Sequence, residues 1–257
     1  MHPLSVSRPV SALILWSVAV SAVFGVAAQP CAAEVVVQYE SGVNQHNPNG
    51  AVGPYFTNPV AASGAVVARD LEAGIGDGAV GLALVLSPVR WGFSSWGTTS
   101  YQDAVAQSDV WHWGFEVDAA ATISLESLEV GTLRNGAATS PDNDPNNVEI
   151  RVSINGSPEV YLASHDFGDV DGATVSWKDL GGIDLTGLAT LHQGDQVLFT
   201  LAGFSAQGGP ADEGGFLELR QGEFLTVHGN VVLLPEPSAA VAALLFAMLT
   251  GVKRRQP

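Results

Sequence analysis

An aromatic segment, residues 90–113, holds the side chains whose types and spacing are most suited to chemistry. Its rings are crowded together beside acidic and amide residues: Trp91, Trp96, Tyr101, Trp111 and Trp113. Flat sugar faces stack on such rings, and carboxylate or amide neighbours bind sugar hydroxyls. We therefore predict Trp91, Trp96 and Tyr101 as candidate residues for binding a polysaccharide.

The other two rings of this segment have a simpler role. Trp111 and Trp113 are two residues apart, so a strand would place both on one face. We expect that face to be buried core. Trp91 and Trp96 lie among Gly and Ser residues, a context typical of a loop, which makes them the better surface candidates.

Oxygen-bearing side chains gather in residues 142–147, Asp-Asn-Asp-Pro-Asn-Asn, at alternate positions as in calcium-binding loops. The run departs from the EF-hand pattern, because its sixth position is Asn147 rather than Gly and its twelfth is Ser153 rather than Glu. A second acidic turn contains Asp166, Asp169 and Asp171. Because Asp and Asn also favour turns, we predict turns and no metal or cofactor, with a structural Ca²⁺ as the alternative.

No combination of residues predicts catalysis. The four histidines of the strand-rich region stand far apart and in no ligand motif: His112, His165, His192 and His228. The chain has no H-E-x-x-H, G-x-S-x-G or P-loop sequence. A glycosidase needs two carboxylates at a fixed separation, and 26 acidic residues favour no particular pair. We therefore predict that the protein is not an enzyme.

The C-terminal stretch combines three elements in a fixed order. Pro235-Glu236-Pro237 precedes an uncharged apolar run, residues 239–252, and Lys253-Arg254-Arg255 follows. The prolines stop a helix from extending upstream, the apolar run is able to enter a bilayer, and the cations favour its cytoplasmic side. Because the run is shorter than about 20 residues, a buried core helix is the alternative, although that helix would lack a polar stripe.

This tail resembles the PEP-CTERM sorting signal of Gram-negative bacteria that make exopolysaccharides. The resemblance implies that residues 234–257 form a sorting signal with a transmembrane helix, which holds an exported protein at the inner membrane. It further implies a partner enzyme, an exosortase, that recognises Pro235, Glu236 and Pro237 and removes the helix.

The N-terminus also predicts export. Arg8 precedes an apolar run over residues 9–28, and small residues offer cleavage sites after Ala28 and after Ala33. Residues 1–33 are therefore predicted to be a secretory signal peptide, with an uncleaved anchor as the alternative. Cys31 is the only cysteine, so no disulfide forms within one chain. With 26 acidic and 10 basic residues, the chain repels phosphates, and we expect no nucleic acid partner.

The region between these ends, residues 34–233, is predicted to be all β. In the clearest strand, 148–154, the apolar residues share one face, and Glu149, Arg151 and Ser153 share the other. Asn155-Gly156 then predicts a tight hairpin turn. Further strands are expected over 35–39, 79–86, 109–117, 122–130 with a bulge or break at Glu126-Ser127, 159–163, 173–177, 196–202, 215–220 and 224–232. Residues 44–59 are expected to be a loop, and no window of 11 residues shows a helical stripe.

Many short strands with Gly, Asn, Asp and Pro turns indicate one jelly-roll-like β-sandwich. Residues 110–232 also resemble a recurring PEP-CTERM ectodomain, on Trp113-Gly114-Phe115-Glu116-Val117, on Leu125-Glu126-Ser127-Leu128 and on the strand 148–154. That resemblance implies a jelly roll with no assigned activity.

Taken together, these features predict an exported bacterial surface or extracellular-matrix protein. It would be membrane-anchored as a precursor and then found at the cell surface or outside the cell. The alternative is a carbohydrate-binding module that acts on exopolysaccharide, with or without Ca²⁺. A hydrolase on the same scaffold has no motif in its favour, and the fold alone does not decide among these functions.

Overall fold

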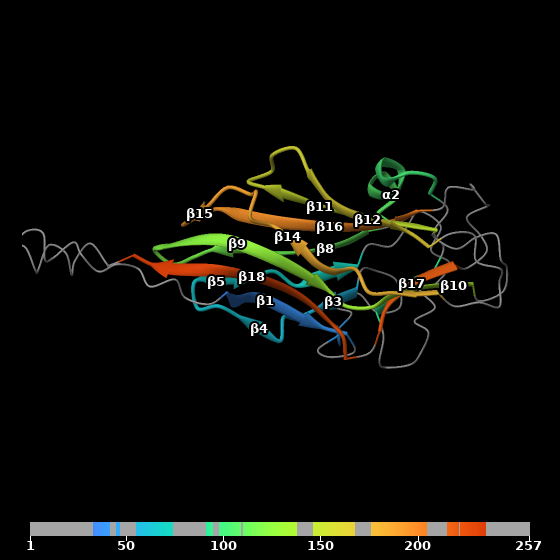
Figure 1. The fold of residues 1–257 in the computed structure, drawn as a ribbon, viewed down its shortest axis with the longest axis horizontal. Coiled ribbons are helices and arrows are strands. Elements are labelled where there is room, and N and C mark those ends of the chain that lie inside the picture. The colour runs from blue at the N-terminus through green and yellow to red at the C-terminus, as the bar shows by residue number, and fades with distance from the viewer. Residues whose placement is uncertain are drawn as a thin grey trace, which may run out of the picture. The chain divides into compact units, whose positions relative to one another are not determined.

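A computed structural model describes residues 33–41, 45–46, 55–73, 91–94, 98–108, 110–137, 146–167, 176–204, 215–220 and 222–234. The chain divides into two units, residues 1–31 and residues 32–257, and all of the described residues belong to the second. They are almost entirely antiparallel β structure, as the sequence predicts (Figure 1).

The first sheet contains the first and the last described strands of the chain. Its order is β14-β9-β18-β1-β4, and β15 also pairs with β9. Its central strand, β18, pairs with β1 on one side and with β9 on the other. The strands are β1 (Glu34–Glu40), β4 (Ala61–Ala62), β9 (Ala121–Val130), β14 (Gly181–Asp184), β15 (Leu191–His192) and β18 (Phe224–Leu233).

The second sheet has the order β12-β11-β16-β8-β6-β3-β2, and β5 also pairs with β8. Its strands are β2 (Gln45–His46), β3 (Tyr55–Thr57), β5 (Val66–Ala68), β6 (Leu71–Ala73), β8 (Val110–Val117), β11 (Asn147–Ile154), β12 (Val160–Asp166) and β16 (Gln196–Phe204). A third, smaller sheet has the order β13-β10-β17-β7. It is formed by β7 (Trp91–Ser94), β10 (Leu133–Ala137), β13 (Ser176–Lys178) and β17 (Gly215–Leu219).

One hydrophobic core joins the two larger sheets and makes the body a β-sandwich. The buried residues of β1, β9 and β18 form one cluster with those of β8, β11 and β16. Trp113 and Phe199 stack within it, with ring centroids 5.5 Å apart. Tyr39 of the first sheet donates its buried hydroxyl to the carbonyl oxygens of Gly114 and Arg69 in the second-sheet region. Trp111 and Trp113 are fully buried in this core, so the prediction for these two rings is confirmed.

Two local predictions are confirmed by the backbone. The β9–β18 ladder shifts its register at Glu126, which is the extra residue of a bulge between Leu125 and Ser127. Asn155 and Gly156 both have positive φ, at 55° and 68°, as a tight hairpin turn requires. The N–H of Ser157 closes this turn on the carbonyl of Ile154, at 3.0 Å.

Three expectations need correction. The predicted loop over residues 44–59 contains β2 and β3, which form by pairing with each other and with β6. Trp91 lies in a strand rather than a loop, because β7 pairs with β17. The body also has a helix, α2 (Tyr101–Gln107), that is too short to produce a helical stripe over 11 residues. The predicted strand 79–86 lies outside the described residues.

The predicted export and sorting segments are residues 1–33 and 234–257, and all of them except residues 33 and 234 lie outside the described residues. Within the described part of the chain, no helix has the length and apolar character needed to cross a membrane. The last described strand, β18, ends at Leu233.

Gly114 provides a test of how closely the strands approach. A Cβ added to it would lie 1.9 Å from the backbone oxygen of Val197, so the Gly114→Ala variant must move a central strand of the second sheet. We expect this change to lower the free energy of unfolding by about 3 kcal/mol, measured by urea titration. The control is Gly182→Ala, in β14, where nothing lies within 4 Å of the added atom. Equal midpoints for the two variants would contradict the close approach.

Candidate functional site

A row of polar side chains crosses the outer face of the second sheet. Directly paired residues form this row, in the order Tyr161, Arg151, Thr200, His112 and Glu72, on β12, β11, β16, β8 and β6. The residues on either side of the row members in β11, β16 and β8 are buried in the core. Because side chains alternate between the two faces of a strand, the row must point away from the core.

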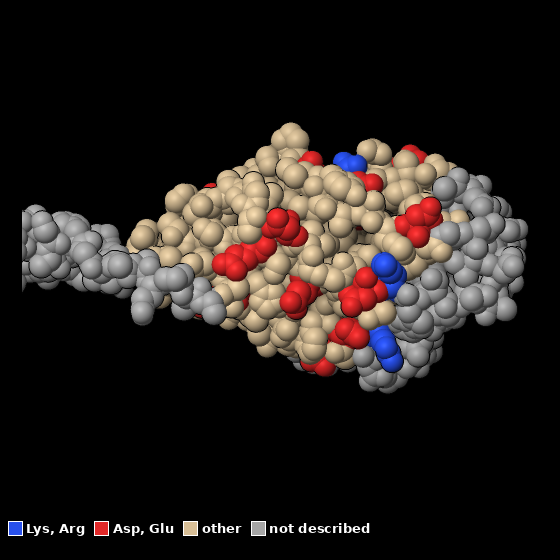
Figure 2. All heavy atoms as spheres, in the orientation of Figure 1, with Lys and Arg blue, Asp and Glu red and all other residues tan. Residues whose placement is uncertain are grey.

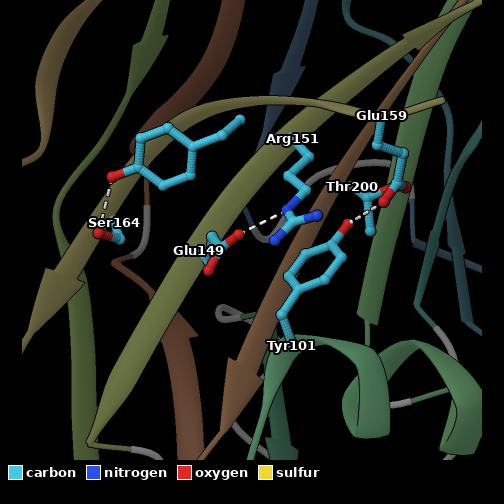
Figure 3. Close-up of polar contacts among 7 residues, drawn as sticks. Tyr101, Glu149, Arg151, Glu159, Ser164 and Thr200 are labelled. Carbon is cyan, nitrogen blue, oxygen red and sulfur yellow. Dashed lines mark hydrogen bonds and ion pairs between the residues drawn. The ribbon is translucent and has the colours of Figure 1, made fainter.

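Glu159 joins the middle of this row. It lies just before β12, and its two carboxylate oxygens accept hydrogen bonds from Tyr101 Oη at 2.8 Å and from Thr200 Oγ1 at 3.1 Å (Figure 3). Thr200 Oγ1 is also 3.2 Å from His112 Nδ1. Since the Thr200 hydroxyl has one proton and donates it to Glu159, His112 Nδ1 must be the donor in this contact. The network therefore fixes the tautomer of His112.

Arg151 is held on two sides. Its guanidinium carbon lies 4.0 Å from the centroid of the Tyr101 ring, a cation–π contact. Its Nε donates to Glu149 Oε1 at 2.5 Å, and the two side chains are 24% and 14% exposed. Figure 3 shows Arg151 between Glu149 and Tyr101. A partly buried guanidinium with two partners has little freedom to rotate, so its remaining N–H groups are fixed in direction.

Helix α2 brings Tyr101 to this position. Ser100 caps the helix, with its hydroxyl accepting from the backbone N–H of Asp103, and the Asp103 carboxylate accepts in return from the Ser100 hydroxyl. The hydrogen bonds that this carboxylate accepts from the Ser100 and Thr99 hydroxyls lower the pKa of Asp103. The helix ends at Ser108, which has a left-handed backbone conformation. Tyr101 and Ala104 then pack on apolar residues of the sheet: Val110, Ala202 and Phe204.

Burial controls the protonation of two members of the cluster. Burial, assisted by the hydrogen bond to Glu159, raises the pKa of Tyr101 well above its usual range. Burial lowers the pKa of His112, although the charges of Glu72 and Glu159 oppose the shift. Tyr101 therefore stays a neutral donor. Because both oxygens of Glu159 are engaged and Glu149 is paired with Arg151, the arrangement is suited to holding α2 and to hydrogen bonding rather than to proton transfer.

Of the three predicted polysaccharide-binding residues, the structure describes Tyr101 and Trp91, which lie in different parts of the body. Tyr101 is 4% exposed, so its ring is not available to a sugar in this structure. Trp91 begins β7 and pairs with Leu219 of β17. It therefore belongs to the third sheet, whereas the polar row lies on the second. Trp96 lies outside the described residues, as do all six residues predicted for sorting: Pro235, Glu236, Pro237, Lys253, Arg254 and Arg255.

The predicted acidic turns are only partly described. Residues 142–145, Asp169 and Asp171 lie outside the described residues, while Asn147 begins β11 and Asp166 ends β12. Among the residues that the structure describes, no three His, Cys, Asp or Glu side chains are grouped to hold a metal ion. Sequence reasoning did place Glu149, Arg151 and Ser153 on one face, but it missed Glu159, Thr200 and His112.

Comparisons with known proteins give little guidance. No protein-family model and no curated protein matches the chain. Two solved structures, of the Gt and Gx strains of infectious bursal disease virus, align at 12% and 11% identity with TM-scores of 0.19 and 0.14. The first alignment covers 85% of this chain and 68% of the viral chain, and the second covers 83% and 63%. Likenesses this weak carry no argument about this protein.

The raised pKa values of Tyr101 and Tyr39 predict loss of stability in alkali. In the unfolded chain a tyrosine ionises near pH 10, while these two stay protonated in the folded state. Their contribution is therefore complete below about pH 10 and is lost as the pH rises further. We expect Tyr101→Phe to lower the free energy of unfolding by about 1 kcal/mol at neutral pH and to weaken the alkaline loss, measured by urea titration at increasing pH. The same alkaline loss in the variant and the wild type would contradict this.

Proposed function

We propose that this protein is an exported bacterial surface or extracellular-matrix protein, sorted and processed through its C-terminal tail, with no catalytic role for its body. The sequence of the tail carries this proposal, because three elements follow one another: Pro235-Glu236-Pro237, the apolar run 239–252, and Lys253-Arg254-Arg255. The position of the tail supports it, because β18 ends at Leu233 and the tripeptide begins two residues later. The tail therefore begins directly after the last described strand of the body.

In this proposal each part of the tail has its own task. Pro235, Glu236 and Pro237 are recognised by an exosortase-type enzyme, and the apolar run anchors the precursor in the inner membrane. Lys253, Arg254 and Arg255 keep the end of the chain on the cytoplasmic side. Export begins with residues 1–33 as a signal peptide, and processing leaves the body at the cell surface or outside the cell.

The body itself is proposed to be a jelly roll. Eight strands, taken in chain order, pair from the outside inward: β1 with β18, β8 with β16, β9 with β14, and β11 with β12. These pairs alternate between the two large sheets. A long hairpin of strands that is wrapped around a core gives this pairing, and jelly rolls are built in this way from two Greek keys.

Carbohydrate binding is the second candidate function of the body. The observation that favours it is the side chain of Tyr161, which is 55% exposed on β12. It lies directly opposite Arg151 on the outer face of the sheet. Sugars bind to sites that combine an aromatic ring open to solvent with a hydrogen-bond donor in a fixed position.

Sorting is tested with the full chain in a bacterium that has an exosortase. We expect the wild-type protein to lose its tail and to leave the membrane fraction. The variant with Pro235, Glu236 and Pro237 all changed to Ala should keep the tail and remain with the inner membrane, as measured by fractionation and by the mass of the mature chain. Pro158→Ala, in the exposed hairpin after β11, is the control and should be processed normally. Normal processing of the triple variant would refute the proposal.

A further inference from the structure

The exposed end of the polar row has a ring in a fixed position. A register shift in the β11–β12 ladder leaves Leu162 as an extra residue, and both Leu162 and Ala163 pack against the core. Tyr161 and Ser164 therefore lie on the same outer face, although they are three residues apart. Their hydroxyl groups are 2.8 Å apart and hydrogen-bonded (Figure 3).

This hydrogen bond determines how the Tyr161 ring is presented. The Ser164 side chain is short, so its hydroxyl stays close to the sheet. A tyrosine that stood away from the sheet would carry its own hydroxyl out of reach, and the ring must instead lie along β12. The Tyr161 side chain is 55% exposed, so more than half of its surface is open to solvent.

Polar groups of both kinds lie beside Tyr161 and Ser164, on the paired strand β11. Arg151, opposite Tyr161, supplies N–H donors whose direction is set by Tyr101 and Glu149. Glu149, opposite Ser164, supplies carboxylate oxygens and is 14% exposed. The donors, the acceptors and the apolar face are all held by contacts within the protein, so little ordering is required when a ligand binds.

We propose that Tyr161, with Arg151, Glu149 and Ser164, binds a neutral polysaccharide through stacking of one sugar ring on the Tyr161 face. The inference rests on the second candidate function and names its site and ligand class. A pyranose ring has one flat face of C–H groups and a rim of hydroxyls, which matches an aromatic face with donors and acceptors beside it. A polyanionic polysaccharide is excluded by charge, because the chain has 26 acidic and 10 basic residues. Acidic side chains are also spread across the face drawn in Figure 2.

Affinity electrophoresis tests this site. The full chain is purified in a detergent without a sugar headgroup and run in native gels that contain amylose, a β-1,3-glucan, a β-1,4-glucan or a galactan. We expect at least one neutral polysaccharide to retard the wild type. We expect Tyr161→Ala to raise the dissociation constant about tenfold, as loss of one stacked ring implies, while Tyr161→Phe keeps most of the retardation. Alginate, a polyanion, should retard none of them.

The neighbouring residue offers a matched control. Val160 is 50% exposed on the same strand but pairs with the core-facing Val152, so Val160→Ala removes a similar apolar surface on the other side of β12. Val160→Ala should bind as the wild type does, and equal thermal melts would show that all variants fold. Absence of retardation in every neutral gel, or equal retardation of Tyr161→Ala, would overturn the proposal. Either result leaves the sorting proposal intact, because sorting is measured by tail removal.

Discussion

The pairing of β1 with β18 is the constraint on which the rest of the body depends. It joins the first and last described strands at the centre of one sheet, and Gln38 Nε2 donates to Thr226 Oγ1 across 188 residues of sequence. Since Cys31 is the only cysteine, no disulfide shares this task. The sheet is held by its ladder and by the core beneath it, which includes Val36, Val227 and Leu225.

The same core explains why the polar row exists. Trp111, Trp113 and Phe199 fill the space between the sheets, so the residues between them on β8 and β16 must face outward. In the middle of the row, Tyr101 of α2 packs on Arg151 and hydrogen-bonds Glu159, which in turn accepts from Thr200. At the β12 end of the row Tyr161 is exposed. The outer face of the second sheet is therefore covered by α2 at Arg151 and exposed to solvent at Tyr161.

Sequence patterns predicted features that depend on a single strand and missed contacts that depend on the packing of several elements. The alternation in residues 148–154 predicted which side chains of β11 face the core, because burial on one side restricts residue types there. Asn155-Gly156 predicted the turn that follows, because few residue types tolerate positive φ. Helix α2 escaped because it is short and depends on packing, although Ser100 and Asp103 have the spacing of a capping box. Tyr101 and Glu159 meet across 58 residues, and only the strand order brings them together.

The central position of β18 has a consequence for the timing of folding. A chain is synthesised from its N-terminus, and β18 is the last described strand to appear. Until residues 224–233 emerge, β1 and β9 have no strand between them, and their apolar faces lack a neighbour in the sheet. The first sheet is therefore completed only after nearly the whole chain has been synthesised. Pairing over such long sequence separations is also slow, so the nascent protein spends its synthesis with this sheet open.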